Sequence, residues 1–521
     1  MRWLAWVGIL AWTGCNGCPG TPGDTAPATR WVDRAFAVKV RARVDTALQA
    51  RRRFDPLIGK VLTPDQVARL SDEMRLALGF DPTSEESLRD AGLDVDGQVA
   101  WGLEPDRLLV SIPAGRPKRL FDLISEQLER RFGKPPEASD GIFRFDRSFG
   151  PDVVEAAALA RHASVVLLGV GPGASELVKA ARSLPEARAA TPELESDAPV
   201  RMVVTPDPRE LRRAVDALPD PGRIDVDRLT ELAEDLGTLT LDGRFTERGA
   251  GMDGLWKLEG DLLERFGGLG VKGEAPPAVE AVNQAGPFLV LQAAMAPRRL
   301  YAALVPPGSP TARAVDQARE EGRLFIDPEP LVDDLSGHFG LAVGGGDLRE
   351  VPFKALVGNP LAHLWTLFVA GKDSGADLEL GKLQDRMKTS QQIDVQDVTI
   401  RDRAASRWVS KEGVHLVTGV ELEDAVLLAN EDAVLDRVLA ELPDARMDPG
   451  LFHLELRFDE LEAVLRTFPG ARLPLVFRAL WARGLDALTA LEAATVRVDT
   501  SSMGLKFDAR LTLDPAESSA P

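Results

Sequence analysis

Cysteine and histidine are both scarce in this chain of 521 residues. Its two cysteines, Cys15 and Cys18, lie close to the N-terminus. The five histidines follow no His-x-x-x-His spacing and have no helical glutamate partner; they are His162, His338, His363, His415 and His453. Zinc sites usually need histidines, cysteines or acidic residues that are grouped at such short spacings. We therefore predict no metal site and no cofactor, although a site assembled from distant histidines stays open.

Motifs for covalent catalysis are also missing, because the chain has neither a Gly-x-Ser-x-Gly elbow nor a Ser-x-x-Lys sequence. Residues 164–175 resemble a dinucleotide-binding turn, but no second strand ending in an acidic residue follows. Asp94 and Asp96 suggest a calcium loop, yet the spacing places Gly92 and Leu103 at essential ligand positions. We interpret both segments as turns and predict no catalytic residue.

An excess of positive charge is lacking, since 62 Lys and Arg face 81 Asp and Glu, a formal charge of -19. Such a surface repels polyphosphates, so a nucleic-acid partner is not expected. One basic group stands out near the N-terminus: Lys39, Arg41, Arg43, Arg51, Arg52 and Arg53. This group either touches anionic lipid headgroups or forms a solvated face.

Long apolar runs are absent too. The longest, between Trp3 and Trp12, is far shorter than the roughly 20 residues of a membrane-spanning helix. We therefore do not expect a polytopic membrane protein. One positive charge at Arg2, an apolar run and small residues follow one another in the order of a signal peptide, which we place at residues 1–14.

Thr13, Gly14 and Cys15 resemble the cleavage box of bacterial lipoproteins, although Trp12 stands where that box usually has leucine. The resemblance implies lipid attachment at Cys15. Cleavage without lipidation, or a redox role for Cys15 with Cys18, are the alternatives. Asn16 after the cysteine implies an outer-membrane destination. Residues 15–30, rich in Pro, Gly, Thr and Ala, are then a flexible tether.

The two halves of the remaining chain resemble each other. Gly97 and Gly337, which lie 240 residues apart (337 minus 97), each precede an apolar run. The runs that we match in order are 36–44 with 288–291, 108–112 with 351–357, 201–205 with 452–458, 239–245 with 495–499, and 255–258 with 504–513. Helical stretches follow at 209–218 and 460–467. A repeated order of elements indicates an internal duplication.

Period-two alternation in these runs favours antiparallel sheets that have one apolar face and one wet face. We predict an α+β fold of two similar units, 31–265 and 283–515, each with helices packed on one face of its sheet. A Gly- and Pro-rich linker spans 266–282. At residues 79–86, Gly79 ends one helix, and Thr83 with Glu86 predicts a capping box for the next.

The lipid box, a strand, a helix pair, a Gly-Phe-Asp-Pro turn at 79–82 and a Gly-Leu-Asp-x-x-Gly hairpin at 92–97 together resemble a group of large predicted bacterial lipoproteins of unknown function. The resemblance supplies no catalytic residue. We expect an exported cell-envelope protein, anchored in the membrane by lipid, with a non-catalytic binding or interaction role toward a lipid or a protein. An envelope hydrolase with a site assembled only in the fold is the alternative.

Overall fold

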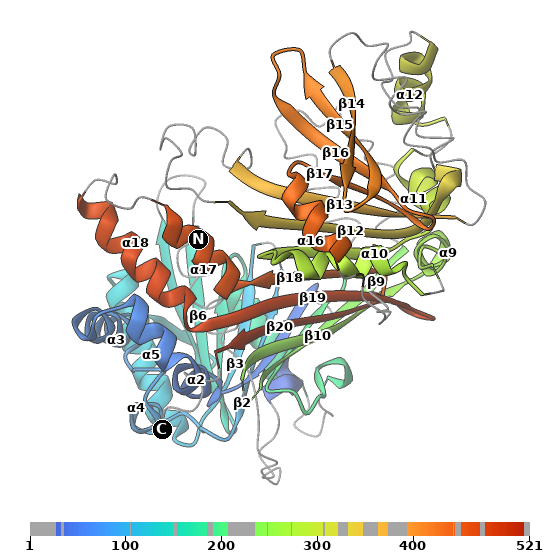
Figure 1. The fold of residues 1–521 in the computed structure, drawn as a ribbon. Helices are drawn as coiled ribbons and strands as arrows, with labels where there is room; N and C mark the ends of the chain where they lie inside the picture. The colour runs from blue at the N-terminus through green and yellow to red at the C-terminus, as the bar shows by residue number, and fades with distance from the viewer. Residues whose placement is uncertain are drawn as a thin grey trace. The chain divides into compact units, whose positions relative to one another are not determined.

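The computed structural model describes residues 28–32, 36–104, 106–148, 154–184, 191–206, 235–246, 248–271, 274–305, 308–320, 332–346, 363–373, 393–440, 442, 450–468 and 475–514 (Figure 1). The predicted signal peptide and lipid-attachment residue Cys15 lie outside this part of the chain. Residues 28–30, predicted to belong to the tether, instead form the short helix η1 (Ala28–Trp31) together with Trp31. Ala28 and Trp31 are buried there, so the folded body begins earlier than expected.

The chain divides into two compact units between Glu259 and Gly260. The sequence predicted a linker at 266–282, but much of this stretch is helical. It holds the end of α9 (Gly260–Gly267), all of α10 (Pro277–Glu280) and the start of η4 (Ala281–Ala285). Its residues Ala275, Ala278, Val279, Ala281 and Val282 are fully buried in the core of unit 2, and this burial outweighs the Gly and Pro content that suggested a linker.

Ten strands of unit 1 form an antiparallel sheet with the order β4-β5-β6-β7-β3-β2-β1-β8-β9-β10. Their bounds are β1 Val38–Arg43, β2 Gln98–Leu103, β3 Leu108–Pro113, β4 Glu137–Ser139, β5 Ile142–Ser148, β6 Val154–His162, β7 Val165–Val170, β8 Val200–Val204, β9 Leu236–Thr246 and β10 Gly249–Leu258. The central strand β1 pairs with both β2 and β8.

Helices cover both faces of this sheet. One face carries α2 (Thr46–Val61), α3 (Pro64–Leu78), α4 (Glu85–Ala91) and α5 (Pro117–Phe132), which lie together in Figure 1. The other carries η1, α6 (Ala174–Arg182) and η2 (Pro192–Leu194). Successive residues of β7 show the two cores, because Val166 and Leu168 join the first and Val165 and Leu167 join the second.

The prediction of helices on one face only is therefore wrong for unit 1. Alternation in β1 predicted a solvent-exposed face carrying Lys39 and Arg41, but these two residues are only 2% and 3% exposed. Lys39 Nζ binds Glu193 Oε2 at 3.1 Å, and Arg41 donates to the carbonyls of Ser196 and Ala198. Polar residues in a strand can thus be buried when a second layer supplies their partners.

In unit 2, ten strands form an antiparallel sheet ordered β14-β15-β16-β17-β13-β12-β11-β18-β19-β20. Their bounds are β11 Leu289–Ala294, β12 Leu335–Gly345, β13 Leu364–Lys372, β14 Ile393–Ile400, β15 Arg403–Ser410, β16 His415–Glu421, β17 Ala425–Ala429, β18 Phe452–Arg457, β19 Leu491–Ser501 and β20 Gly504–Leu513.

The main core of unit 2 lies between this sheet and the helices α10, η4 and α16 (Asp432–Ala440). Leu427 belongs to it, whereas its neighbours Val426 and Leu428 join a smaller cluster around Trp408 on the opposite face. The remaining described helices are α11 (Pro297–Leu304), α12 (Pro310–Glu320), α17 (Phe458–Thr467) and α18 (Leu475–Leu488).

The two sheets have the same strand order, each strand of unit 2 standing ten numbers after its counterpart. The sequence matches correspond to β1 with β11, β8 with β18, β9 with β19 and β10 with β20. The match of 108–112, which is β3, with 351–357 is wrong, because the strand in the position of β3 is β13. Residues 351–357 and the helix predicted at 209–218 lie outside the described residues.

The turn between α3 and α4 differs in detail from its prediction. Gly79 ends α3 with φ +83°, as expected for a left-handed helix end. The residue that caps α4 is Ser84, whose hydroxyl accepts a hydrogen bond from the Ser87 amide. Thr83 does not cap the helix, because its hydroxyl donates to the Asp81 carboxylate. A complete capping box occurs instead at the start of α3, between Thr63 and Gln66.

Candidate functional site

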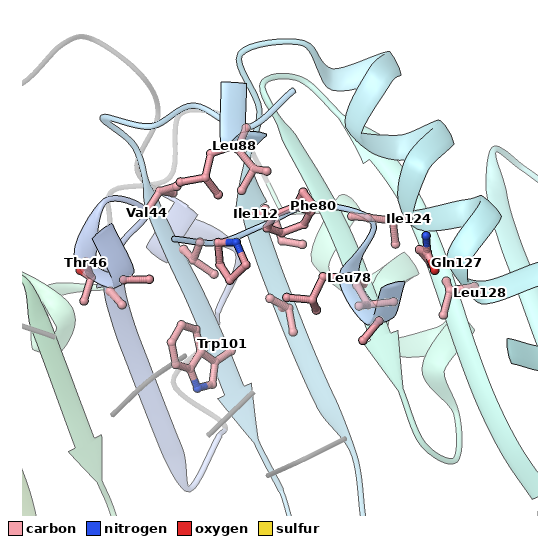
Figure 2. A pocket seen from close by; sticks show the side chains of 18 of the residues that line it. Val44, Thr46, Leu78, Phe80, Leu88, Trp101, Ile112, Ile124, Gln127 and Leu128 are labelled. Atoms are coloured by element: carbon pink, nitrogen blue, oxygen red, sulfur yellow. The ribbon is translucent and has the colours of Figure 1, made fainter. Parts of the chain in front are cut away.

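A cavity of about 480 Å³ lies inside unit 1, between the sheet and the helices α2 to α5 (Figure 2). Its lining is mostly apolar. Strands β1, β2, β3 and β7 form the floor, to which they contribute Ala42, Val99, Trp101, Val110, Ile112 and Leu168. Alternation in these strands directs the listed side chains to one face, and the same face carries the core shared with α5.

The roof of the cavity is formed by α2, α3, α4 and α5. Leu78, Phe80 and Leu88 close one part of it, and Ile124 and Leu128 of α5 close another. No residue of α3 is fully buried. Leu76 of this helix lines the cavity and is nevertheless 79% exposed. The roof helix α3 is thus held by few buried contacts, which is typical of elements that open at low free-energy cost.

Asp81 fastens the roof at the turn after α3. Its carboxylate accepts hydrogen bonds from Ser71 Oγ in α3 and from the Thr83 amide at 2.8 Å and hydroxyl at 2.6 Å. Arg51 of α2 donates to the same Thr83 hydroxyl at 2.6 Å. Burial alone would raise the pKa of Asp81, but the hydrogen bonds from Ser71 and Thr83 hold it below its ordinary value. The ionised carboxylate therefore ties α2 and α3 to the turn.

The basic group predicted near the N-terminus is divided by the fold. Lys39 and Arg41 are buried on the face opposite the cavity, so the headgroup contact suggested for them is wrong. Arg43 forms a bidentate pair with Asp45 at 3.0 and 2.9 Å. Arg52 lies 3.7 Å from Glu85. These side chains are thus engaged in structural contacts of unit 1.

The histidines do not form a common site. His162 packs edge-on against Trp31, with ring centroids 4.7 Å apart. His453 Nε2 lies 3.9 Å from Glu455 Oε2. His338 Nδ1 lies 3.4 Å from Ser336 Oγ. Within the described ranges, no group of three or more His, Cys, Asp or Glu side chains is arranged to hold a metal ion.

His415, Thr418 and Asp432 bring an imidazole, a hydroxyl and a carboxylate together in unit 2. Thr418 Oγ1 lies 2.9 Å from His415 Nε2 and donates to Asp432 Oδ1 at 2.5 Å. Arg407 also pairs with Asp432. Because the hydroxyl proton is donated to the carboxylate and Thr418 is fully buried, the oxygen is not activated by the imidazole. The arrangement instead ties β16 to the start of α16.

The two glycine-containing motifs are turns. Strand β7 leads into α6 through Gly171 and Gly173, which adopt φ values of +101° and +69°. At 94–97 the Asp94 carbonyl accepts from the Gly97 amide at 3.1 Å. Both interpretations made from the sequence are confirmed as local structure.

No protein-family model, curated protein or solved structure matches this chain. Among the helices that the structure describes, none is both long enough and apolar enough to cross a membrane.

The cavity residues were not singled out from the sequence. Leu76, Leu78 and Phe80 look like ordinary core positions, and the floor residues look like one face of any antiparallel strand. A signal was present in α5, where Ile124 and Leu128 are followed at helical spacing by Arg131. Only the packing of α2 to α5 over the sheet leaves the space between the helices and the strands unfilled.

Proposed function

We propose that this protein binds an apolar ligand, a single acyl chain, in the cavity of unit 1, and that it does so as a lipid-anchored protein of the cell envelope. The cavity carries the proposal. Its volume lies within the roughly 300 to 1,000 Å³ typical of small-molecule sites, and apolar side chains dominate its wall. Burial of each methylene contributes about 0.8 kcal/mol, so a space of this shape favours a hydrocarbon chain.

The roof supports the same proposal. A ligand that fills the cavity needs a route of entry, and α3, without a fully buried residue, is the element that can move at the lowest cost. The anchor at Asp81 lies at one end of this helix and leaves its remainder held by partly exposed side chains.

The cellular context follows from the N-terminal sequence. Lipid attachment at Cys15 with an outer-membrane destination would hold the cavity near a source of acyl chains. An internal duplication would explain the common strand order of the two units. The hydrolase alternative has weaker support, since the hydroxyl of Thr418 donates to Asp432 and is buried.

Native mass spectrometry tests this function. The chain from Gly20 to Pro521, which retains every described residue, is produced in a bacterial periplasm, and bound molecules are extracted with organic solvent. We expect a bound mass that the extract identifies as an acyl lipid. An unliganded protein that also fails to take up added palmitate would contradict the proposal and leave a protein-protein role in the envelope.

Substitution within the cavity locates the ligand. Ile124→Trp places a larger side chain into the space between α5 and the floor, so binding of palmitate should be lost while the fold is retained. Leu416→Trp, at an exposed position of unit 2, is the matched control and should bind like the natural protein. Brominated palmitate provides a second readout, because a brominated chain in the cavity quenches the fluorescence of Trp101. The Trp101→Phe variant should therefore show less quenching than the natural protein.

A further inference from the structure

The charged residues of the cavity wall are all basic. Three arginines line it, Arg43, Arg130 and Arg131, and no Asp or Glu is found among the described lining residues. The chain as a whole has the opposite bias, with 81 acidic against 62 basic residues. A wall whose charges have one sign, in a protein of the other sign, points to a ligand that carries negative charge.

The basic residues are not equivalent. Arg43 is bound by both oxygens of Asp45, which neutralises it. Arg130 pairs with Glu126 one turn earlier in α5, where both side chains are exposed. Arg131 is also engaged in an interaction within the protein, but it is exposed and lines the cavity at the same end of the helix.

Helix α5 orders the apolar and polar parts of the wall. Ile124, Leu128 and Arg131 recur at spacings of four and three, so they lie along one side of the helix with Gln127 beside them. From Ile124 to Arg131 the helix rises about 10 Å. Figure 2 shows Gln127 next to Ile124 and Leu128 at one end of the cavity. Within the described part of the protein, the Gln127 amide forms no hydrogen bond.

We propose that the ligand is an anionic single-chain amphiphile. Its carboxylate or phosphate lies at the end of the cavity formed by Gln127, Arg130 and Arg131, and its chain runs past Ile124 toward Trp101. The inference rests on the proposed function, because it assigns the head of the acyl ligand and the direction in which the chain enters. An amide and guanidinium groups are donors suited to such oxygens.

Binding of matched probes tests this orientation. Titration calorimetry on the chain from Gly20 to Pro521 compares palmitate and palmitoyl glycerol phosphate with hexadecanol, each below the concentration at which it aggregates. We expect the anionic probes to bind about tenfold more tightly than the alcohol. Raising the ionic strength should reduce this preference and leave the alcohol unaffected. The tighter of the two anionic probes identifies the carboxylate or the phosphate as the natural head.

Variants of α5 provide the decisive comparison. Arg131→Gln should weaken binding of the anionic probe by roughly threefold to tenfold and leave hexadecanol binding unchanged. Arg119→Gln removes the same charge from the first part of the helix, outside the cavity wall, and should change neither. Thermal unfolding of each variant verifies its fold.

The possible results separate this inference from the function on which it rests. If both anionic probes and hexadecanol bind equally to the natural protein and to the Arg131→Gln variant, the head assignment is overturned and the acyl site stands. If none of them binds, or if all bind equally to the Ile124→Trp variant, both the site and the head assignment are overturned.

Discussion

In unit 1 the central strand β1 carries Arg41 at the register position where β11 of unit 2 carries Gln292. Arg41 faces Ala100 and Arg201 on the neighbouring strands, and Gln292 faces Gly340 and His453. Both side chains are buried. The same place in the same strand order is thus filled by a cation in one unit and by a neutral amide in the other.

The partners differ with the charge. Gln292 Nε2 donates one hydrogen bond to the Val279 carbonyl at 3.1 Å. Arg41 donates to two carbonyls, those of Ser196 and Ala198, in the segment that leads into β8. Burial and the neighbouring Arg201 lower the pKa of Arg41 to about 10. The sheet therefore fixes where a polar side chain is buried, whereas the segment that covers the sheet decides which polar group can be accommodated there.

Removing each polar group should have unequal effects. Arg41→Leu leaves two partly buried carbonyls without their donor, and we expect a loss of about 3 kcal/mol in the unfolding free energy of unit 1. Gln292→Leu removes one hydrogen bond, but it also removes the side-chain oxygen, which is buried and has no partner within the described residues. The second change offsets part of the first, so the cost in unfolding free energy should be only about 1 kcal/mol. Hydrogen exchange resolved by unit measures both. Equal losses would show that the ionic arrangement has no special weight.

The roof anchor occurs in unit 1 and should respond to acid. Asp81→Asn weakens the bonds from Ser71 and Thr83, and we expect a loss of about 2 kcal/mol at pH 7 with faster exchange of α3. Because the folded pKa of Asp81 lies below 3.8, its contribution is present above that pH and disappears as the pH falls through the folded pKa. The variant and the natural protein should therefore converge in acid.

Asp90→Asn is the matched control for the roof anchor, since Asp90 is exposed at the end of α4. It should leave exchange of α3 unchanged. If α3 exchanged equally fast with and without the Asp81 carboxylate, the roof would be held by other contacts.

A smaller effect is expected from Glu455 of β18, which has Val203 as its counterpart in unit 1. The neighbouring His453, followed by the hydrogen bonds from Arg457, outweighs the effect of burial and lowers the pKa of Glu455 from 4.5 to about 2. Its stabilisation is present above pH 4.5 and is lost as the pH falls toward 2. Glu455→Gln should cost about 1 kcal/mol at pH 7, after allowance for partial exposure, and nothing near pH 2.

Acid titration of unfolding in each unit measures this difference. Glu423→Gln, at an exposed position of unit 2, is the control and should not alter the profile. An acid response of the same size in the Glu455 variant and the natural protein would contradict the assignment.

Several strands followed directly from the sequence. Alternation in 36–44, 239–245 and 504–513 marks segments that the structure places in β1, β9 and β20. Four of the five matched pairs of segments occupy corresponding strands of the two sheets, and the pair 108–112 with 351–357 does not. The alternation could not show whether the second face of a sheet is covered, since Lys39 and Arg41 look alike in a solvated strand and in a buried one.

Local chemistry was predicted less well where two polar residues compete. Thr83 fits a capping box by its spacing from Glu86. In the folded turn, however, the Thr83 hydroxyl donates to the Asp81 carboxylate, and Ser84 caps α4 instead. The helix end at Gly79 was correctly predicted because a left-handed conformation restricts the choice of residue. A Cβ added at Gly79 would also lie 2.9 Å from the Leu123 side chain, so packing favours glycine there as well.

The sequence by itself determined the α+β character of the protein, the positions of many strands and the repetition of their order, because side-chain periodicity and glycine conformations are local properties of the chain. Tertiary structure alone decided that both faces of the first sheet are covered, that Arg41 is buried, and that the helices α2 to α5 leave a cavity over the sheet, lined by Trp101 and Ile124 among others. Burial and empty space depend on which distant segments pack together, and periodicity within one segment carries no record of that.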